Sequence, residues 1–401
     1  MENLLGFTSI LIVSLITLIL AYKRPEVFNF LIVALIIRVI VLLIGYYIVP
    51  LPDSTSDAIG FEIVTRNLAK DGFFNLLGEF DLNPFIFFSW VQAVPYSLFG
   101  QSILMGQSIS LLFGIGTIFL TWKVAFIIWD KNIANKVGWT MALFPSLVLY
   151  SVLFLRAIYI CFFLSLSLYG IVLWVKSGSF KAIIFAFTGF ICATLFHGAM
   201  FVGALIFLII LIIKYLKDFF ILIKKQKINF RNFFFIFLLF FAFSLYFTNN
   251  IKISYLGNFK SINTKLLIKK THYAFRGDAS WPEWTKANSG LELIYKAPIR
   301  SIYFAYSPFP WDVKKAKHLI GLFDGLLYIY LSYLILFNLK YIWKDPCLRI
   351  IFILLLSYLF IFGFGVGNFG TGIRHRVKFV FMFILLAAPM IKKFTFYKTN
   401  N

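Results

Sequence analysis

Residues 28–78 read FNFLIVALIIRVIVLLIGYYIVPLPDSTSDAIGFEIVTRNLAKDGFFNLLG, an apolar run that changes abruptly after Pro50. The first part, residues 28–50, is long enough and apolar enough to cross a bilayer as a helix. The second part carries four carboxylates, at Asp53, Asp57, Glu62 and Asp71. Carboxylates beside a membrane span are costly to hold there, and they mark functional sites more often than structural ones.

The composition assigns the whole chain to the membrane class. Its 401 residues are 61% hydrophobic, include 52 Phe and are only 13% charged, whereas soluble domains carry about 25% charged residues. Long apolar runs without alternation favour helices over a barrel. We therefore predict an all-α polytopic membrane protein, a single membrane domain over residues 1–401. About eleven transmembrane helices are expected, near residues 4–21, 28–50, 103–129, 137–155, 157–175, 182–196, 198–215, 232–248, 318–340, 350–367 and 377–391.

The basic residues predict the orientation. The net charge of +22 resembles that of a nucleic-acid-binding protein, but most Lys and Arg lie in short loops between spans, and these loops fall on one face of the membrane. The positive-inside rule makes those loops cytoplasmic, so we expect a multi-pass protein of a bacterial inner membrane and no nucleic-acid partner. The outer, periplasmic or extracellular face then receives the unusual polar features: a first outer loop at 51–102, Arg156, His197, a long outer loop at 249–317 and residues 374–376.

An aromatic run closes the first outer loop. Residues 83–100 read NPFIFFSWVQAVPYSLFG, and Pro84, Gln92 and Pro95 favour a helix lying at the interface over a span. Treating the run as a span would also invert every later loop. Together with an amphipathic helical pattern that starts at Asp57, it predicts interfacial juxtamembrane helices in this loop.

Acidic residues of the first outer loop are the candidate catalytic groups. Asp57 or Asp53 would activate a hydroxyl or orient a substrate, and Glu62 would contact substrate. The structural alternative for Asp57 is a helix cap, a position that Asp favours. The three cysteines have no ligand spacing, so we expect no cofactor, and a divalent metal has no support from the sequence.

Basic residues of the outer face are candidates for binding a lipid phosphate. Arg156 is suited to oxyanions, although a lone Arg at the end of a span also snorkels. A glycine-rich turn at 363–372 precedes Arg374, His375 and Arg376, and such a turn lets backbone N–H groups approach an anion. The alternative is a flexible loop whose arginines touch lipid headgroups.

Three residues of the long outer loop and one residue of a predicted turn are further candidates for substrate contact. Arg276, Trp281 and Trp311 would form a platform for a sugar ring, or else Trp281 and Trp311 belong to an interfacial aromatic belt. His197 lies in a predicted tight turn between two spans, where it is either a capped-turn histidine or a substrate contact.

The order of several motifs over roughly residues 28–200 resembles the N-terminal module of the GT-C superfamily of glycosyltransferases, which includes the protein O-mannosyltransferase and aminoarabinose transferase group. The motifs are Asp57-x3-Phe61, Asn83-Pro84-Phe85-x4-Trp90-x-Gln92-Ala93, Leu98-Phe99-Gly100 and Trp129-Asp130-Lys131. The chain has Ala58 where the family often has a second acid. That difference argues against a metal at this position.

The resemblance implies an inverting transfer of a sugar from a polyprenyl-(pyro)phosphate donor to a glycan or a lipid-linked acceptor. Asp57 would be the base, and the departing lipid phosphate would be stabilised by Arg156, Arg374, His375 and Arg376. A polymerase of O-antigen or exopolysaccharide repeat units would use the same groups. A transporter of lipid-linked oligosaccharide is a third alternative, but only Arg38 and Asp324 fall clearly inside predicted spans. A non-catalytic scaffold would leave the clustering of polar residues on one face unexplained.

Overall fold

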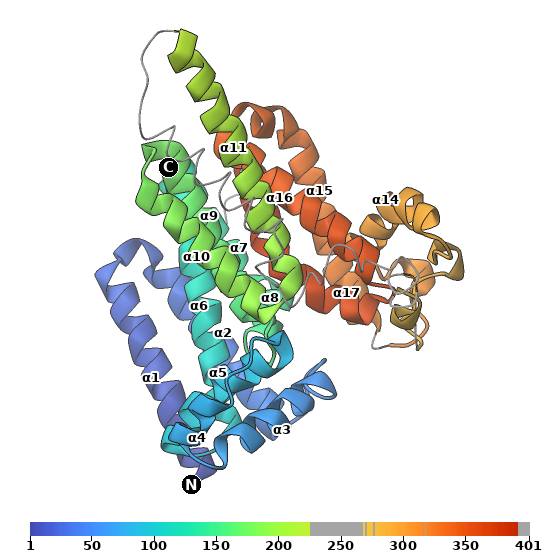
Figure 1. Cartoon of the computed structure of the whole chain (residues 1–401). Helices are drawn as coiled ribbons and strands as arrows, with labels where there is room; N and C mark the ends of the chain where they lie inside the picture. Colours follow the sequence, from blue (N-terminus) through green and yellow to red (C-terminus); the bar gives the residue numbers. More distant parts are fainter. Residues whose placement is uncertain (225–267, 269–270, 276, 317, 392–401) are drawn as a thin grey trace, which may run out of the picture.

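The computed structural model describes residues 1–224, 268, 271–275, 277–316 and 318–391. These residues form helices with only one isolated β-bridge, and seven of the helices are long and apolar enough to cross a membrane. The chain is therefore a polytopic α-helical membrane protein, with the long helices packed side by side (Figure 1). They are α1 (Glu2–Lys23), α2 (Phe28–Tyr47, preceded by η1, Pro25–Val27), α6 (Ile103–Ile128), α9 (Ala157–Ser177), α11 (Phe201–Lys224), α15 (His318–Lys344) and α16 (Pro346–Gly365).

Four of the eleven predicted spans have no counterpart among these seven helices. The span expected at 232–248 lies outside the described residues. The one expected at 182–196 corresponds to α10 (Phe180–Phe196), a shorter apolar helix of 17 residues. α10 ends at His197, and η2 (Gly198–Met200) leads into α11, so the predicted turn between these two helices is present. The remaining two spans, 137–155 and 377–391, are interrupted.

The interruption at 137–155 is caused by a proline. α7 (Lys131–Leu143) ends before Pro145, and α8 (Pro145–Tyr150) starts there. Proline disfavours helical geometry in the residue before it, and Phe144 is extended, with φ −66° and ψ 118°. Proline also lacks the N–H that Met141 O would accept. Arg38 of α2 replaces that donor: its guanidinium donates to Met141 O at 3.4 Å and to Ala142 O at 2.9 Å.

The segment expected to span at 377–391 is a broken helix inside the protein. It consists of η6 (Val377–Phe379), α18 (Val380–Ala387) and η7 (Ala388–Met390). Every residue from 377 to 388 is buried. Apolar composition alone therefore suggested a lipid-facing span where the structure has a core segment surrounded by other helices.

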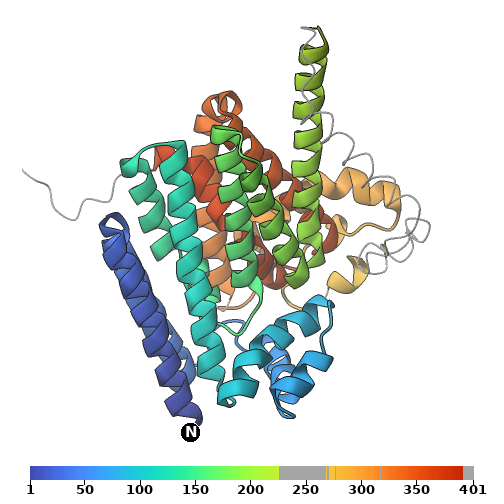
Figure 2. The ribbon, with the colours of Figure 1, turned by 60° about the vertical axis from the view of Figure 1, so that its left-hand side comes forward.

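Residues 51–102, the predicted first outer loop, include three helices at one end of the bundle, α3 (Asp57–Ala69), α4 (Phe73–Gly78) and α5 (Pro84–Phe99), as Figure 2 shows. Pro84 occupies the first turn of α5, and the Asn83 side chain accepts from Phe85 N. α5 packs on α3 through Phe61, whose ring lies 4.4 Å from that of Phe85. The expectation of short helices in this loop, with residues 84–99 not among the long spans, is confirmed.

The long outer loop expected at 249–317 falls partly outside the described residues. Its described part includes η4 (Glu283–Thr285), α14 (Gly290–Tyr306) and η5 (Pro310–Asp312). α14 lies beside α16 and α17 (Phe369–Arg376) in Figure 1. Arg300 of α14 donates to Gly363 O at 2.9 Å and Val366 O at 2.9 Å, so it satisfies carbonyl groups left open at the end of α16.

A buried ion pair joins α17 to α15 and α14. Arg376 is fully buried and lies 2.6 Å from the carboxylate of Asp324. Its remaining N–H groups donate to Ser307 O, Ala305 O and Gly321 O at 2.6, 3.3 and 3.3 Å. All five donors of the guanidinium are thereby satisfied, which makes a buried charge tolerable.

Removing Arg376 should destabilise the protein strongly, because Asp324 would remain charged and unpaired in the interior. We expect Arg376→Leu to lower the free energy of unfolding by about 3–5 kcal/mol, measured by thermal unfolding of the purified protein in detergent. The control is Arg374→Leu, which removes a partly exposed cation two residues away and should cost about 1 kcal/mol or less. Adding Asp324→Leu to Arg376→Leu should restore part of the loss. Equal losses for the two arginine variants would contradict this role.

Candidate functional site

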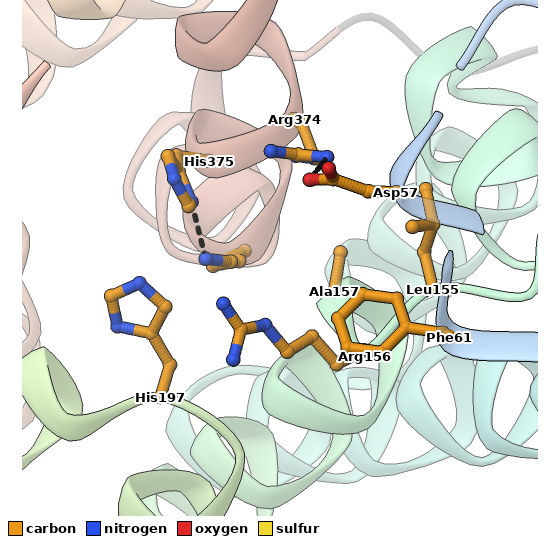
Figure 3. A pocket seen from close by; sticks show the side chains of 9 residues that line it. Asp57, Phe61, Leu155, Arg156, Ala157, His197, Arg374 and His375 are labelled. Carbon is orange, nitrogen blue, oxygen red and sulfur yellow. Dashed lines mark hydrogen bonds and ion pairs between the residues drawn. The ribbon is translucent and has the colours of Figure 1, made fainter. Parts of the chain in front are cut away.

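A small cavity lies where α3, the start of α9, the α10–η2 turn, α17 and η6 meet. Its volume is about 80 Å³, room for several waters by the measure that one water needs about 10–15 Å³. Figure 3 shows its side chains directed toward a common space. They belong to Asp57, Phe61, Leu155, Arg156, Ala157, His197, Arg374, His375 and Lys378.

Five residues that the sequence singled out separately converge on this cavity: Asp57, Arg156, His197, Arg374 and His375. They come from four segments of the chain, and Asp57 and Arg374 are 317 positions apart. The sequence predicted only that these residues share one face; the structure brings the acidic loop and the basic residues into direct contact.

Asp57 and Arg374 form an ion pair across one side of the cavity (Figure 3). Asp57 is the first residue of α3, and the residue in the cap position is Ser56, whose side chain makes no capping bond. The alternative that Asp57 merely caps the helix is therefore wrong. Its carboxylate lies at a helix N-terminus, where negative charge is favoured, and 53% of the side chain remains exposed.

Arg156 extends from beside Phe61 toward His197 (Figure 3). Its guanidinium donates to Phe196 O at 3.1 Å, a carbonyl at the end of α10, and lies 5.6 Å from the centre of the Phe61 ring. These contacts hold the cation at the cavity wall.

Lys378 is a cavity residue that sequence reasoning missed. Its ammonium group lies 2.5 Å from Nδ1 of His375, close enough to donate a hydrogen bond to that nitrogen. The sequence signal was its position shortly after the basic cluster at 374–376. It was overlooked because residues 377–391 were assigned to a span, where a lysine has no lipid-facing place.

Two histidines occupy the wall opposite Asp57, and both lie outside the spanning segments. The rings of His197 and His375 meet edge to face, with centroids 5.3 Å apart. Burial lowers the pKa of each imidazole well below its usual value, and the positive charge of Lys378 lowers both further. His197 Nδ1 is buried and has no hydrogen-bond partner within the described part of the chain. Both rings are therefore neutral near pH 7.

The charges of the lining residues favour an anion. Arg156 and Arg374 are cations, and Asp57 is the one carboxylate among the nine lining residues. Burial and the two arginine charges hold the pKa of the Lys378 amine well below its usual value, so a bound anion beside it would favour its charged form. Arginine and lysine N–H groups form short, strong hydrogen bonds with phosphate oxygens, so the cavity is suited to a phosphate group.

Arg376 and the glycine-rich turn require correction. Arg376 points into the protein and all its donors have internal acceptors, so we remove it from the phosphate site. Residues 363–372 are not a flexible anion-binding loop. They comprise the end of α16, a short extended link and the first turn of α17, where Asn368 Oδ1 accepts from Thr371 N at 2.8 Å. Gly363 instead allows close contact with Ser301.

The second candidate acid and the nearby glutamate lie outside the cavity. Asp53 accepts a hydrogen bond from the Tyr150 hydroxyl at 2.5 Å. Glu62 lies on the packed face of α3 and pairs with Arg66, which also reaches Glu2 at 3.0 Å. Arg66 therefore ties α3 to the start of α1, and Glu62 is its partner within α3, which gives Glu62 a structural role without a substrate.

The two tryptophans do not form a shared platform at the cavity. Trp281 is 2% exposed, and its Nε1 donates to Ser307 Oγ at 3.1 Å. Trp311 is 69% exposed and stacks on Phe309, with ring centres 4.9 Å apart. Arg276, the third member of the expected platform, lies outside the described residues. The interior position of Trp281 was not apparent because aromatic residues beside charges occur in both sugar sites and packed cores.

No family model matches the chain, and neither a curated protein nor a solved structure matches it.

The neutral histidines predict a specific dependence of stability on pH. Below about pH 6.5 the unfolded chain protonates these imidazoles, whereas the folded protein resists protonation because their pKa values are lowered. The unfolded state then binds more protons, so stability rises with pH in this range and falls on acidification. We expect His375→Gln to reduce this acid-induced loss, measured as unfolding temperature between about pH 7.5 and about pH 5.5. An unchanged slope in both His375→Gln and His197→Gln would contradict the assignment.

Proposed function

We propose that this protein is a membrane glycosyltransferase that moves a sugar from a polyprenyl-(pyro)phosphate donor to a glycan or a lipid-linked acceptor. The observation that carries the proposal is the cavity itself, in which a single carboxylate faces an excess of cations at one end of a membrane bundle. The GT-C resemblance of the first outer loop agrees with it. We place the reaction at the outer face of a bacterial inner membrane, on the basis of the positive-inside rule.

The chemistry follows from the charges. The acceptor hydroxyl attacks the anomeric carbon of the donor sugar, and Asp57 takes the hydroxyl proton. The bond between the anomeric carbon and the phosphate oxygen breaks, and its electron pair leaves with the lipid phosphate. Arg156, Arg374 and Lys378 then stabilise the negative charge that develops on that phosphate, an effect that is larger in a partly dry site than in water.

Arg374 gives the site a way to couple donor binding to base activation. In the structure it pairs with the Asp57 carboxylate. Phosphate oxygens of a donor would compete for the same guanidinium, and their binding would release Asp57 to accept a proton. The base would then act only when the donor is in place, which limits attack by water.

The charged residues inside the predicted spans fit an enzyme better than a transporter. A transporter of lipid-linked oligosaccharide needs polar groups that line a path through the spans. Arg38 and Asp324 are the two charges that the sequence placed within spans. Arg38 is bonded to Ser151 Oγ and to backbone carbonyls, and Asp324 is paired with Arg376. Both are used to hold helices together. A repeat-unit polymerase would use the same cavity chemistry and is the alternative that the experiment below separates.

Replacing Asp57 or Arg374 should abolish transfer without removing the protein from the membrane. A strain lacking the gene would be complemented with wild type, Asp57→Asn or Arg374→Gln, and its cell-envelope and lipid-linked glycans profiled. General-base catalysis is worth about 10²–10⁴-fold, so we expect Asp57→Asn to resemble the deletion. The matched control is Asp71→Asn, an exposed acid in the same loop, which should restore the wild-type profile.

The outcomes separate the alternatives. Loss of one sugar supports a monosaccharide transferase, and glycans limited to single repeats support a polymerase. Complete lipid-linked glycan trapped on the cytoplasmic face would support the transporter. Wild-type profiles from both Asp57→Asn and Arg374→Gln, at normal membrane levels, would refute the proposed site.

The phosphate-binding role can be tested without an acceptor. Purified protein in detergent should bind a short-chain isoprenyl phosphate and should not bind the corresponding isoprenol, as measured by calorimetry. Each hydrogen bond from a cation is worth about 1.5–3 kcal/mol, so Arg156→Met and Lys378→Met should each weaken binding by about 10–100-fold. The control is Lys315→Met, an exposed lysine outside the cavity. Equal binding of the phosphate and the alcohol would contradict an anion site.

A further inference from the structure

One face of α14 is apolar and exposed although this helix is not among the seven long spans. Leu291, Ile294, Tyr295 and Ile302 are 80%, 61%, 69% and 45% exposed, and Pro298 between them is also exposed. Their spacing of three and four positions places them on one side of the helix. An exposed apolar face of this kind marks an interaction surface.

The other faces of α14 are already occupied. Leu293, Ala297, Arg300 and Phe304 are buried against the rest of the protein. The charged residues lie at the flanks, where Lys296 pairs with Glu292 at 2.6 Å. The outward face carries no charge, so water is a poor solvent for it.

Contacts with α16 fix the level of α14 relative to the bilayer. α16 has 20 residues and is about 30 Å long, which equals the thickness of the hydrocarbon core. Arg300 donates to Gly363 O and Phe364 O, among the last carbonyls of that helix. α14 therefore meets α16 at the edge of the hydrocarbon.

Contacts with α15 give the same level independently. A Cβ atom on Gly325 would lie 2.3 Å from Tyr306 O, so the end of α14 touches α15 at this glycine. α15 has 27 residues and is about 40 Å long, roughly 10 Å more than the hydrocarbon core. Gly325 follows His318 by seven positions, about 10 Å along the axis. A centred span of this length enters the hydrocarbon about 5 Å from its end, so Gly325 lies about 5 Å inside that edge, within the depth reached by interfacial helices.

Aromatic side chains near α14 match this level. Trp284 is 57% exposed and packs edge-on against Tyr303, and Tyr295 belongs to the exposed face itself. Tryptophan and tyrosine concentrate at membrane interfaces, where an apolar ring and a polar tip are both accommodated.

We propose that α14 is an interfacial membrane helix whose exposed face, formed by Leu291, Ile294, Tyr295 and Ile302, inserts into the boundary between headgroups and acyl chains. The partner is the lipid bilayer. Helices of this kind embed their apolar face about 5–10 Å deep in that boundary. Because Arg376 bonds to Ala305 O of α14 and to Ser307 O directly after it, lipid contact also fixes the depth of α17, which carries Arg374 and His375.

Spin labels in the full-length protein test the lipid contact. Single cysteines at Ile294 and Tyr295 would be labelled in a background lacking Cys161, Cys192 and Cys347, and the protein reconstituted in phosphatidylethanolamine–phosphatidylglycerol vesicles. Collision with oxygen, which prefers lipid, is compared with collision with a water-soluble nickel chelate. Leu326→Cys in α15 is the lipid control and Asn288→Cys the aqueous control, both at exposed positions.

We expect both α14 labels to follow the lipid control, with oxygen collisions exceeding nickel collisions. Labels that follow Asn288→Cys would overturn the proposal in favour of a water-exposed face. Dipolar broadening between labels would overturn it in favour of a second copy of the chain. Immobile labels shielded from both reagents would overturn it in favour of another protein or segment.

The consequence for α17 rests on the proposed transferase and is tested separately. Ile294→Asp places a charge on the lipid face, and Ile294→Leu keeps it apolar at the same position. We expect Ile294→Asp to lower glycan transfer several-fold at equal membrane abundance and Ile294→Leu to have no effect. Lipid-exposed labels combined with full activity of Ile294→Asp would refute only the coupling between lipid contact and the site. Lipid-exposed labels in a wild-type protein that shows no transferase activity would refute the proposed function, and the interfacial position of α14 would still stand.

Discussion

The ion pair between Arg376 and Asp324 is the constraint on which the candidate site depends. A buried guanidinium is tolerated only if its charge and its donors are satisfied, so Arg376 must face α15 and the end of α14. Successive residues of an α-helix are separated by about 100°, and Arg374 therefore points to the side of α17 opposite Arg376. That side is the cavity. Two arginines that look equivalent in the sequence thus have different roles, one holding the helix and the other facing Asp57.

Arginines also donate hydrogen bonds to carbonyl groups at helix ends elsewhere in the protein. Carbonyl groups at helix ends have no water to bind in the apolar interior. Arg38 supplies donors where Pro145 interrupts the chain, Arg156 supplies one at the end of α10, and Arg300 supplies several at the end of α16. Part of the high positive charge is therefore structural and internal. The cavity forms among such helix ends, because polar side chains gather there to satisfy the open carbonyl groups.

The sequence predicted the elements that depend on local composition and on the pattern of neighbouring residues. Length and apolar composition predicted the long helices, and Asn83, Pro84 and the amphipathic pattern after Asp57 predicted the short helices of the first outer loop. Loop parity predicted that Asp57, Arg156, His197, Arg374 and His375 share one face of the membrane, but it did not predict that they converge on one cavity.

The remainder depends on tertiary packing. Whether an apolar run is lipid-facing or internal is decided by its neighbours, which is why 377–391 was assigned to a span and Lys378 was missed. Arg376 and Trp281 were assigned to ligand sites because their internal partners, Asp324 and Ser307, are distant in the chain. Residue type indicated that these side chains need polar partners, but it did not indicate whether those partners are protein or substrate.

We propose that the cavity binds the phosphate of a lipid-linked sugar beside Asp57. The most direct measurement is a cryo-electron microscopy structure of the full-length protein in a lipid nanodisc with a non-transferable polyprenyl-phosphate sugar analogue. We expect phosphate density in contact with Arg156, Arg374 and Lys378, with Arg374 moved away from Asp57 and the anomeric carbon within reach of that carboxylate. Phosphate density at another position, with the Asp57–Arg374 pair intact, would contradict it.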